Sequence, residues 1–323
     1  MKAVFAALLL ACGLAQAAPK LLTFDGSGRL LTITEAAIRA GGVAYVSRDA
    51  LYGASAASVE DERGVLHQVL WVTGDDTEIG VAVVWIGLQA PPGPDEATQK
   101  PAMVQSAGHS SKVLEPRETG AEGVLARLEC TPAHAPVSAP LYDEHGLFAG
   151  WHVSRTVDGR VFSFAAPGDR IRGLATIKRL TLEQWNAGHS REREATYARA
   201  LGHLWADDID GALFYLRKVV DADPSNARAW LQLGFAQGKA GLGPQRIRSY
   251  QEAIRIDPTL GAARYLLGMN LLMSGDRDGA AAQHKALKNL GSPYAERLKS
   301  FLEALHVDEL DNKKVRHRHN PSA

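Results

Sequence analysis

Residues 223–234, DPSNARAWLQLG, are followed 34 residues later by residues 257–268, DPTLGAARYLLG, and this recurrence indicates how the C-terminal half folds. The Asp-Pro pair and the Leu-Gly pair keep the same spacing in both copies. Between these markers, apolar residues recur at spacings of three and four, which is the period of an amphipathic helix. The pattern predicts stacked helical hairpins, with a small residue where two helices approach closely and a proline where the second helix ends.

A 34-residue period with Trp-x-x-Leu-Gly and a closing proline resembles the tetratricopeptide (TPR) family. The resemblance implies three units, near residues 193–226, 227–260 and 261–294. A capping helix is expected to follow them, from Pro293 to His306. The fold class expected for this half is therefore an all-α TPR solenoid.

The N-terminal half has a different pattern. Glycine and proline interrupt it, and between them lie five short runs that read as strands: residues 43–46, 67–72, 79–86, 123–130 and 147–153. Many short strands with turn signals predict a β-barrel or a β-sandwich. The spacing becomes helical at residues 181–184, Thr-Leu-Glu-Gln, which have the form of a helix-starting capping box.

We therefore expect a multidomain chain. Its expected parts are a signal peptide (1–17), a β domain (18–175), a linker or helix (176–192), the repeats with their capping helix (193–306) and a basic disordered tail (307–323).

Five segments of the β half resemble, in order, the trypsin-like domain of HtrA-type serine proteases. They are GSGRLL (26–31), DALYGAS (49–55), DTEIGVAV (76–83), APVSAPLYDEHGLFAG (135–150) and SFAAPGDRI (163–171). The resemblance covers residues 24–172 and implies an all-β, trypsin-like double β-barrel.

The resemblance also implies where a catalytic triad would lie. It assigns the histidine position to Asp49, the aspartate position to Gly80 and the nucleophile position to Val137. Catalysis needs a hydroxyl nucleophile, a histidine base and an aspartate that orients the base, and these groups act as a unit. None of the three side chains supplies its part, and Pro136 removes a backbone donor beside the oxyanion hole. We therefore expect no catalytic residue and interpret the domain as a pseudoprotease.

One enzymatic alternative stays open. Ser138 directly follows the nucleophile position, and His134, His145 and His152 are close to it in the sequence. A serine–histidine pair among them would make the β domain a serine hydrolase or peptidase with a rearranged active site. The histidines fit no zinc motif and no phosphate loop is found, so neither a metal nor a cofactor is expected.

A TPR stack curves into a groove lined by the first helix of each hairpin. By register, the resemblance assigns this groove an aromatic, methionine-bearing and partly basic set of side chains, which are types enriched in protein interfaces. The expected protein-binding residues are Tyr197, Trp205, Arg228, Phe235, Lys239, Tyr265, Met269 and Met273. The expected partner is a protein or a peptide, while leucines in the same register are expected to fill the core.

The first 17 residues predict export. Lys2, an apolar run and Ala15-Gln-Ala17 have the form of a secretory signal peptide cleaved after Ala17, which predicts a periplasmic or secreted protein. Lipidation at Cys12 is the alternative. Lys+Arg and Asp+Glu are equal at 36 each, which gives no reason to expect a nucleic acid as partner. No later stretch is apolar for long enough to predict a transmembrane segment.

The sequence thus predicts an exported, catalytically inactive trypsin-like protein whose TPR repeats bind a protein partner, as a scaffold or an envelope assembly factor. The alternative is a serine hydrolase with Ser138 as displaced nucleophile. The oligomeric state stays open.

Overall fold

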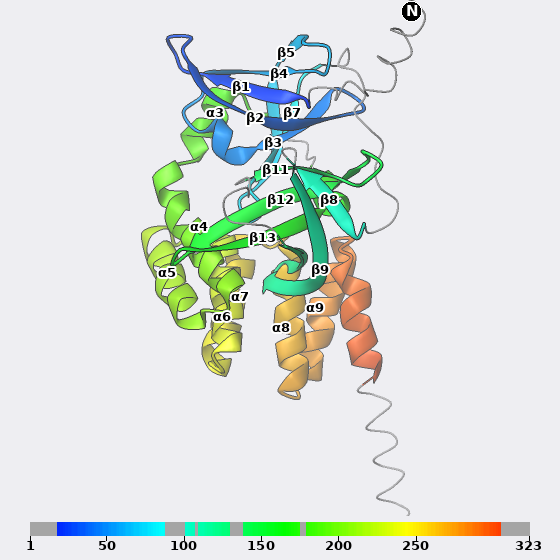
Figure 1. The fold of residues 1–323 in the computed structure, drawn as a ribbon. Coiled ribbons are helices and arrows are strands. Elements are labelled where there is room, and N and C mark those ends of the chain that lie inside the picture. Colours follow the sequence, from blue (N-terminus) through cyan, green and yellow to red (C-terminus); the bar gives the residue numbers. More distant parts are fainter. Residues whose placement is uncertain (1–17, 88–100, 107–108, 130–137, 175–178, 305–323) are drawn as a thin grey trace, which may run out of the picture. The chain divides into compact units, whose positions relative to one another are not determined.

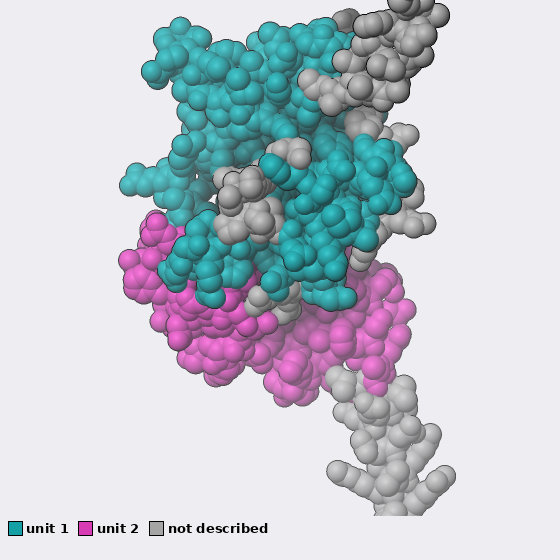
Figure 2. All heavy atoms as spheres, viewed as in Figure 1, with its two compact units in different colours: residues 1–117, 125–198 teal, residues 118–124, 199–323 magenta. Residues whose placement is uncertain are grey.

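The computed structural model describes residues 18–87, 101–106, 109–129, 138–174 and 179–304. They form two compact units, which Figure 2 shows in different colours. The first unit holds residues 1–117 and 125–198, and the second holds residues 118–124 and 199–323. The turn at residues 118–124 therefore groups with the helices.

Seven strands of the first unit form one antiparallel sheet in the order β5-β4-β1-β2-β3-β7-β6 (Figure 1). They are β1 (Lys20–Phe24), β2 (Leu30–Arg39), β3 (Val43–Ser47), β4 (Ala56–Glu60), β5 (Leu66–Gln68), β6 (Trp71–Asp76) and β7 (Val81–Trp85).

The edges of this sheet meet through two residues, Val69 and Leu70, which separate the edge strands β5 and β6 in the chain. The N–H of Val69 donates to Ala57 O on β4, and the N–H of Leu70 donates to Trp85 O on β7, each at 2.9 Å. The sheet therefore curls on itself as a barrel does. The prediction of a single strand over 67–72 is wrong, because the chain crosses there from one edge of the sheet to the other.

A short helix, α3 (Leu182–Gly188), covers the core of this first barrel. The Thr181 side chain accepts from the Gln184 N–H and the Gln184 side chain accepts from the Thr181 N–H, so the predicted capping box is confirmed. Trp185 is fully buried among barrel residues such as Leu21 and Val84. The helix thus completes the hydrophobic core of the barrel.

The second barrel is closed, with the order β10-β13-β12-β11-β8-β9. Its strands are β8 (Met103–Ser106), β9 (His109–Gly120), β10 (Gly123–Glu129), β11 (Ser138–Tyr142), β12 (Phe148–Val157) and β13 (Arg160–Pro167). Gly150 allows β12 to pack closely on β13, because a Cβ there would lie 2.2 Å from Ala166 O. A one-turn helix, α2 (Gly168–Arg172), follows the last strand.

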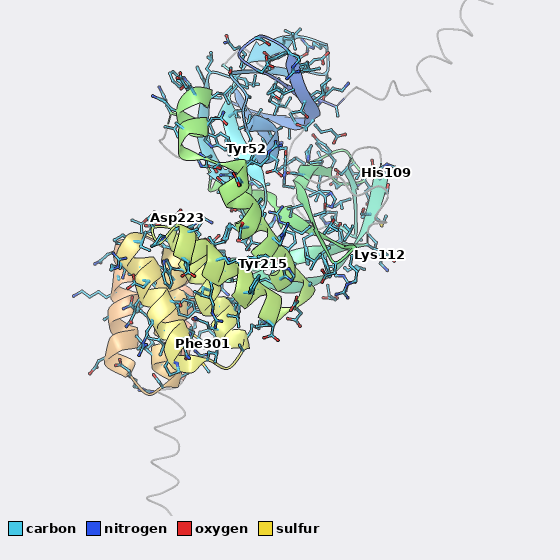
Figure 3. All side chains as sticks on the ribbon, turned by 90° about the vertical axis from the view of Figure 1, so that its left-hand side faces the viewer. Tyr52, His109, Lys112, Tyr215, Asp223 and Phe301 are labelled. Carbon is cyan, nitrogen blue, oxygen red and sulfur yellow. The ribbon has the colours of Figure 1, made fainter. Side chains whose placement is uncertain are left out.

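Helices make up the C-terminal half. They are α4 (Arg191–Ala206), α5 (Ile209–Ala222), α6 (Ala227–Lys239), α7 (Gly243–Ile256), α8 (Gly261–Met273) and α9 (Arg277–Asn289), followed by helical residues 294–304. The rings of His203 on α4 and Tyr215 on α5 stack with centroids 5.1 Å apart (Tyr215 is labelled in Figure 3). The next two pairs, α6 with α7 and α8 with α9, pack as hairpins.

The repeat seen in the sequence has a structural counterpart. Trp230 Nε1 donates to Pro224 O at 3.0 Å, and 34 residues later Arg264 Nε donates to Pro258 O at 2.9 Å. The small residue also has the predicted role, because a Cβ on Gly234 would lie 2.6 Å from the ring of Tyr250 on α7. Hairpins of this kind define a solenoid.

The predicted fold class is confirmed: an all-β domain of two trypsin-like barrels, followed by an all-α TPR solenoid. Among the described residues, no helix has the length and apolar content needed to cross a membrane. The predicted signal peptide with Cys12, and the predicted basic tail, lie outside the described residues.

Candidate functional site

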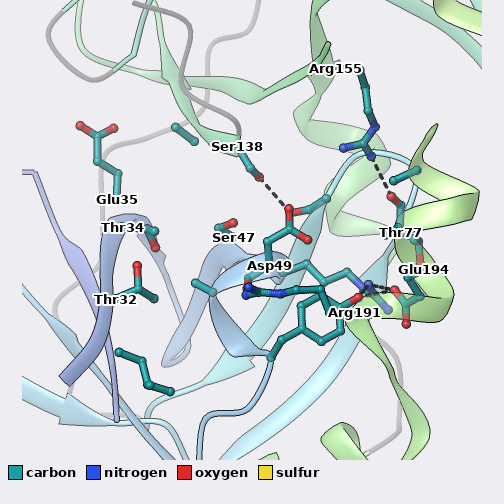
Figure 4. Close-up of a pocket in the computed structure, with 18 residues that line it drawn as sticks. Thr32, Thr34, Glu35, Ser47, Asp49, Thr77, Ser138, Arg155, Arg191 and Glu194 are labelled. Carbon is teal, nitrogen blue, oxygen red and sulfur yellow. Dashed lines mark hydrogen bonds and ion pairs between the residues drawn. The ribbon is translucent and has the colours of Figure 1, made fainter. Parts of the chain in front are cut away.

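The first unit contains a cleft of about 910 Å³ that both barrels and the start of α4 line (Figure 4). Its lining is mixed in charge and contains hydroxyl, carboxylate and guanidinium groups. The residues are Leu31, Thr32, Thr34, Glu35, Ser47, Arg48, Asp49, Ala50, Tyr52, Thr77, Gly80, Ser138, Ala139, Arg155, Arg191, Glu194, Ala195 and Ala198.

Three residues singled out from the sequence line this one cleft: Asp49, Gly80 and Ser138. Asp49 lies in the 3-10 turn η1 (Arg48–Leu51) that follows β3, Gly80 precedes β7, and Ser138 begins β11. Val137 lies outside the described residues. The fold thus brings together segments that are far apart in the chain.

The backbone of Gly80 links these segments. Its φ of +65° is in the left-handed region that favours glycine. Its carbonyl oxygen accepts from the Arg48 N–H and from the Ser138 hydroxyl, each at 2.9 Å. A backbone carbonyl therefore connects the turn that holds Asp49 to the strand that begins with Ser138.

The Ser138 hydroxyl both donates and accepts a hydrogen bond. It donates to Gly80 O and accepts from Trp151 Nε1 at 2.7 Å, and Ser138 as a whole is only 8% exposed. A serine nucleophile needs a base that takes its proton. None of the described residues that line the cleft is a histidine.

The two described histidines near Ser138 in the sequence do not supply that base. Ser138 pairs with Val153 and Ala139 pairs with His152, so His152 points to the opposite face of the sheet. Burial lowers the pKa of His152 to about 4. The His145 side chain is 74% exposed, and its Nε2 lies 3.7 Å from a Glu144 carboxylate oxygen. His134 lies outside the described residues.

A buried arginine organises the other wall of the cleft. The Arg48 side chain is 3% exposed; its Nε donates to Asp75 Oδ2 at 2.5 Å and its Nη1 to the Glu194 carboxylate. Tyr52, labelled in Figure 3, accepts from Arg48 and donates to Glu194. Burial raises the pKa of the Tyr52 hydroxyl well above its usual value, so the hydroxyl stays a donor.

The start of α4 lies over the position where a histidine would be expected. Arg191 Nη2 donates to Asp49 O at 3.0 Å, and the Arg191 guanidinium lies 5.6 Å from the centroid of the Tyr52 ring. On the other side, Arg155 Nη2 donates to the carbonyls of Thr77 and Glu78, both at 3.1 Å. The cleft is thus a polar pocket whose arginine side chains are held in place by hydrogen bonds.

Sequence reasoning missed Arg48, Tyr52, Trp151, Arg155 and Glu194. Arg48 and Glu194 are separated by 146 residues in the chain, so no motif joins them. The one signal available was that Arg48 immediately precedes the histidine position.

The predicted groove residues of the helical half fall into three groups. Tyr197, Trp205 and Phe235 are buried. Tyr265 and Met269 are half-buried in the cluster formed with the last helical segment, where Tyr265 stacks on Tyr294.

The remaining groove residues reach the surface or a charged partner. Met273 is 72% exposed and Lys239 is exposed, with its ammonium 5.5 Å from the Phe235 ring centroid. Arg228 forms an ion pair with Glu122.

No family model matches the sequence, and no curated protein matches it. Among solved structures, the chain is similar to the Rv3671c protease from M. tuberculosis in its active form, at 13% identity and a TM-score of 0.38, over 51% of this chain and 83% of that one. It is also similar to PcrH in complex with the chaperone binding region of PopD, at 26% identity and a TM-score of 0.35, over 38% of this chain and 97% of that one. The type III secretion chaperone SycD of Yersinia enterocolitica, with a peptide of the translocator YopD, matches at 20% identity and a TM-score of 0.35, over 38% of this chain and 99% of that one.

Proposed function

We propose that this chain is an exported, non-catalytic binding protein. Its β domain is a degenerate protease that serves as a platform, and its TPR repeats dock a protein partner as part of a scaffold or an envelope assembly factor. The observation that carries the proposal is the Gly80 carbonyl, which accepts from the Ser138 hydroxyl in the cleft where a protease would work.

The chemistry of acyl transfer supports this reading. The attacking oxygen must lose its proton to a base in the transition state, and the base must itself be oriented. The Ser138 proton instead points to a backbone carbonyl, which is not a base at neutral pH, and the Trp151 N–H occupies the oxygen. Gly80, at the aspartate position, has no side chain that could orient a histidine.

A covalent probe tests the absence of catalysis. The mature protein is incubated with a fluorophosphonate and analysed by intact mass and peptide mapping, with an active trypsin-like protease labelled in parallel. We expect no adduct while the control protease is fully labelled. A stoichiometric adduct on Ser138, or on any other serine, would sink the proposal and make the β domain a hydrolase.

The exposed methionine of the third hairpin tests the docking role. We expect Met273→Ser to weaken capture of the partner, because Met273 presents an apolar side chain that is 72% exposed. Phe214→Ser is the matched control, since Phe214 is 53% exposed on α5, outside the predicted groove. Equal capture by both variants and the wild type would contradict docking at this groove.

Export has its own test. N-terminal sequencing of the protein recovered from its native host should show a chain that begins at Ala18. A chain that starts at Met1, or at a lipid-modified Cys12, would contradict cleavage after Ala17.

A further inference from the structure

The turn between β9 and β10 contacts α6 through its backbone and through a side chain. The N–H of Ala121 donates to Gln232 Oε1 at 2.9 Å, and the Glu122 carboxylate pairs with the Arg228 guanidinium. Ala121 also packs against the hydrophobic cluster that contains Leu231. The turn and α6 belong to the same compact unit.

The contacting side chains differ in exposure. Gln232 is 1% exposed and the Glu122 side chain is 13% exposed, whereas the Arg228 side chain is 40% exposed. Gln232 Nε2 has no hydrogen-bond partner among the described residues. A buried amide with a satisfied acceptor and an unused donor is costly unless a further acceptor arrives, so it marks a place where a ligand carbonyl would be stabilised.

Arg228 and Gln232 lie four residues apart, which places them side by side on one face of α6. Arginine pairs well with carboxylates, and a primary amide offers the acceptor and the donor that match a peptide unit. The residues one repeat later are Ala262 and Leu266, which can do neither. The polar pair is therefore a local feature of the second hairpin and not a requirement of repeat packing.

We propose that residues 119–122 are a built-in ligand of the TPR repeats. They place an N–H on Gln232 and a carboxylate on Arg228, as an acidic peptide of a partner would, so a partner binds α6 only by displacing them. This inference rests on the proposed docking function. It adds the chemistry of the partner, which is an acidic peptide segment with a small residue directly before the acidic one. It also adds a competition between this segment and residues 119–122, which controls the partner's access to α6.

The tether makes this competition strong. A segment held in the same chain acts at an effective concentration on the order of millimolar, so an external peptide must overcome it before it binds. Weakening the internal contact should therefore increase the affinity for an external copy of the same segment.

The test uses the full mature chain and a fluorescein-labelled peptide of residues 117–126, followed by anisotropy. We expect Glu122→Gln to bind the peptide about fivefold to tenfold more tightly than the wild type does, since one charge-assisted contact of the internal ligand is lost. Glu115→Gln, an exposed glutamate earlier on β9, is the matched control and should bind as the wild type does. Adding Arg228→Gln to Glu122→Gln should remove the gain.

Equal affinity of the wild type and the Glu122→Gln variant would overturn the inference, and so would a gain that survives Arg228→Gln. No binding by any variant would overturn it as well, because the segment would then not be a ligand. Peptide affinity reports on α6, whereas fluorophosphonate labelling reports on the cleft and Met273→Ser on partner docking. Failure of the inference is therefore distinguishable from failure of the proposed function.

Discussion

The Ser138 hydroxyl donates its proton to the carbonyl oxygen of Gly80, 2.9 Å away, in the cleft of the β domain. The same hydroxyl accepts from Trp151, which is fully buried. Ser138 therefore connects three segments of the domain through hydrogen bonds.

The first prediction concerns this link. Ser138→Ala should lower the free energy of unfolding by about 1–3 kcal/mol, because the indole N–H of Trp151 loses its acceptor in a buried site. Urea unfolding followed by tryptophan fluorescence measures the change. Ser163→Ala is the control, since the Ser163 hydroxyl is buried without a partner among the described residues, and its loss should cost less than about 0.5 kcal/mol. Equal losses for the two variants would contradict the structural role of Ser138.

The second prediction concerns Arg48. Arg48→Met should destabilise the first unit by about 2–3 kcal/mol, because it leaves Asp75 and Glu194 without their shared cation in a partly buried cluster. Arg29→Met is the matched control: Arg29 pairs with Asp25, but its side chain is 78% exposed. Solvent screens an exposed pair, so Arg29→Met should destabilise the protein much less than Arg48→Met does. A similar shift of the thermal transition in both variants would show that Arg48 has no special role.

The third prediction is a pH dependence from His152. Burial holds its pKa in the folded protein at about 4, against 6.5 as the unperturbed value. Between these values the unfolded chain binds a proton that the folded protein does not, so stability falls as the pH falls from 6.5 to 4. The total loss is about 3 kcal/mol.

His152→Leu should remove this part of the pH dependence, and urea unfolding at several pH values measures it. His145→Leu is the control, since His145 is 74% exposed and should leave the profile unchanged. A His152→Leu profile as steep as that of the wild type would contradict the assignment.

The fourth prediction concerns the repeat. Gly234→Ala should cost about 1–3 kcal/mol, because the added Cβ would lie 2.6 Å from the Tyr250 ring and force α6 away from α7. Gly238→Ala is the control, since it lies on the same helix, its Cβ would meet Arg246 Cδ at an ordinary 3.5 Å, and alanine favours a helix. Loss of helical circular dichroism on heating compares the two. A variant at Gly234 as stable as the wild type would show that the helices separate at no cost.

The helical repeat was predictable in detail because its contacts are local. The cap of α6 by Asn226, the close approach at Gly234 and the hydrogen bond from Trp230 to Pro224 all join residues that are close together in the chain. The strand at 67–72 was predicted wrongly, because an apolar run looks the same whether it lies in one strand or passes between two edges of a curled sheet.

The amino-acid sequence alone established that the two halves of this protein have different periodicities, and it predicted the order of the parts and the triad positions Asp49, Gly80 and Val137. Those features follow from the types of side chain and from the short sequence distances between them, which can be read directly from the amino-acid sequence. The folded structure was needed to show that the Ser138 proton points to Gly80, that Arg48 pairs with Glu194 and that Glu122 pairs with Arg228. Each of these pairs joins residues at least 58 positions apart, and only the folding of both barrels and of the helical stack brings them within hydrogen-bond distance.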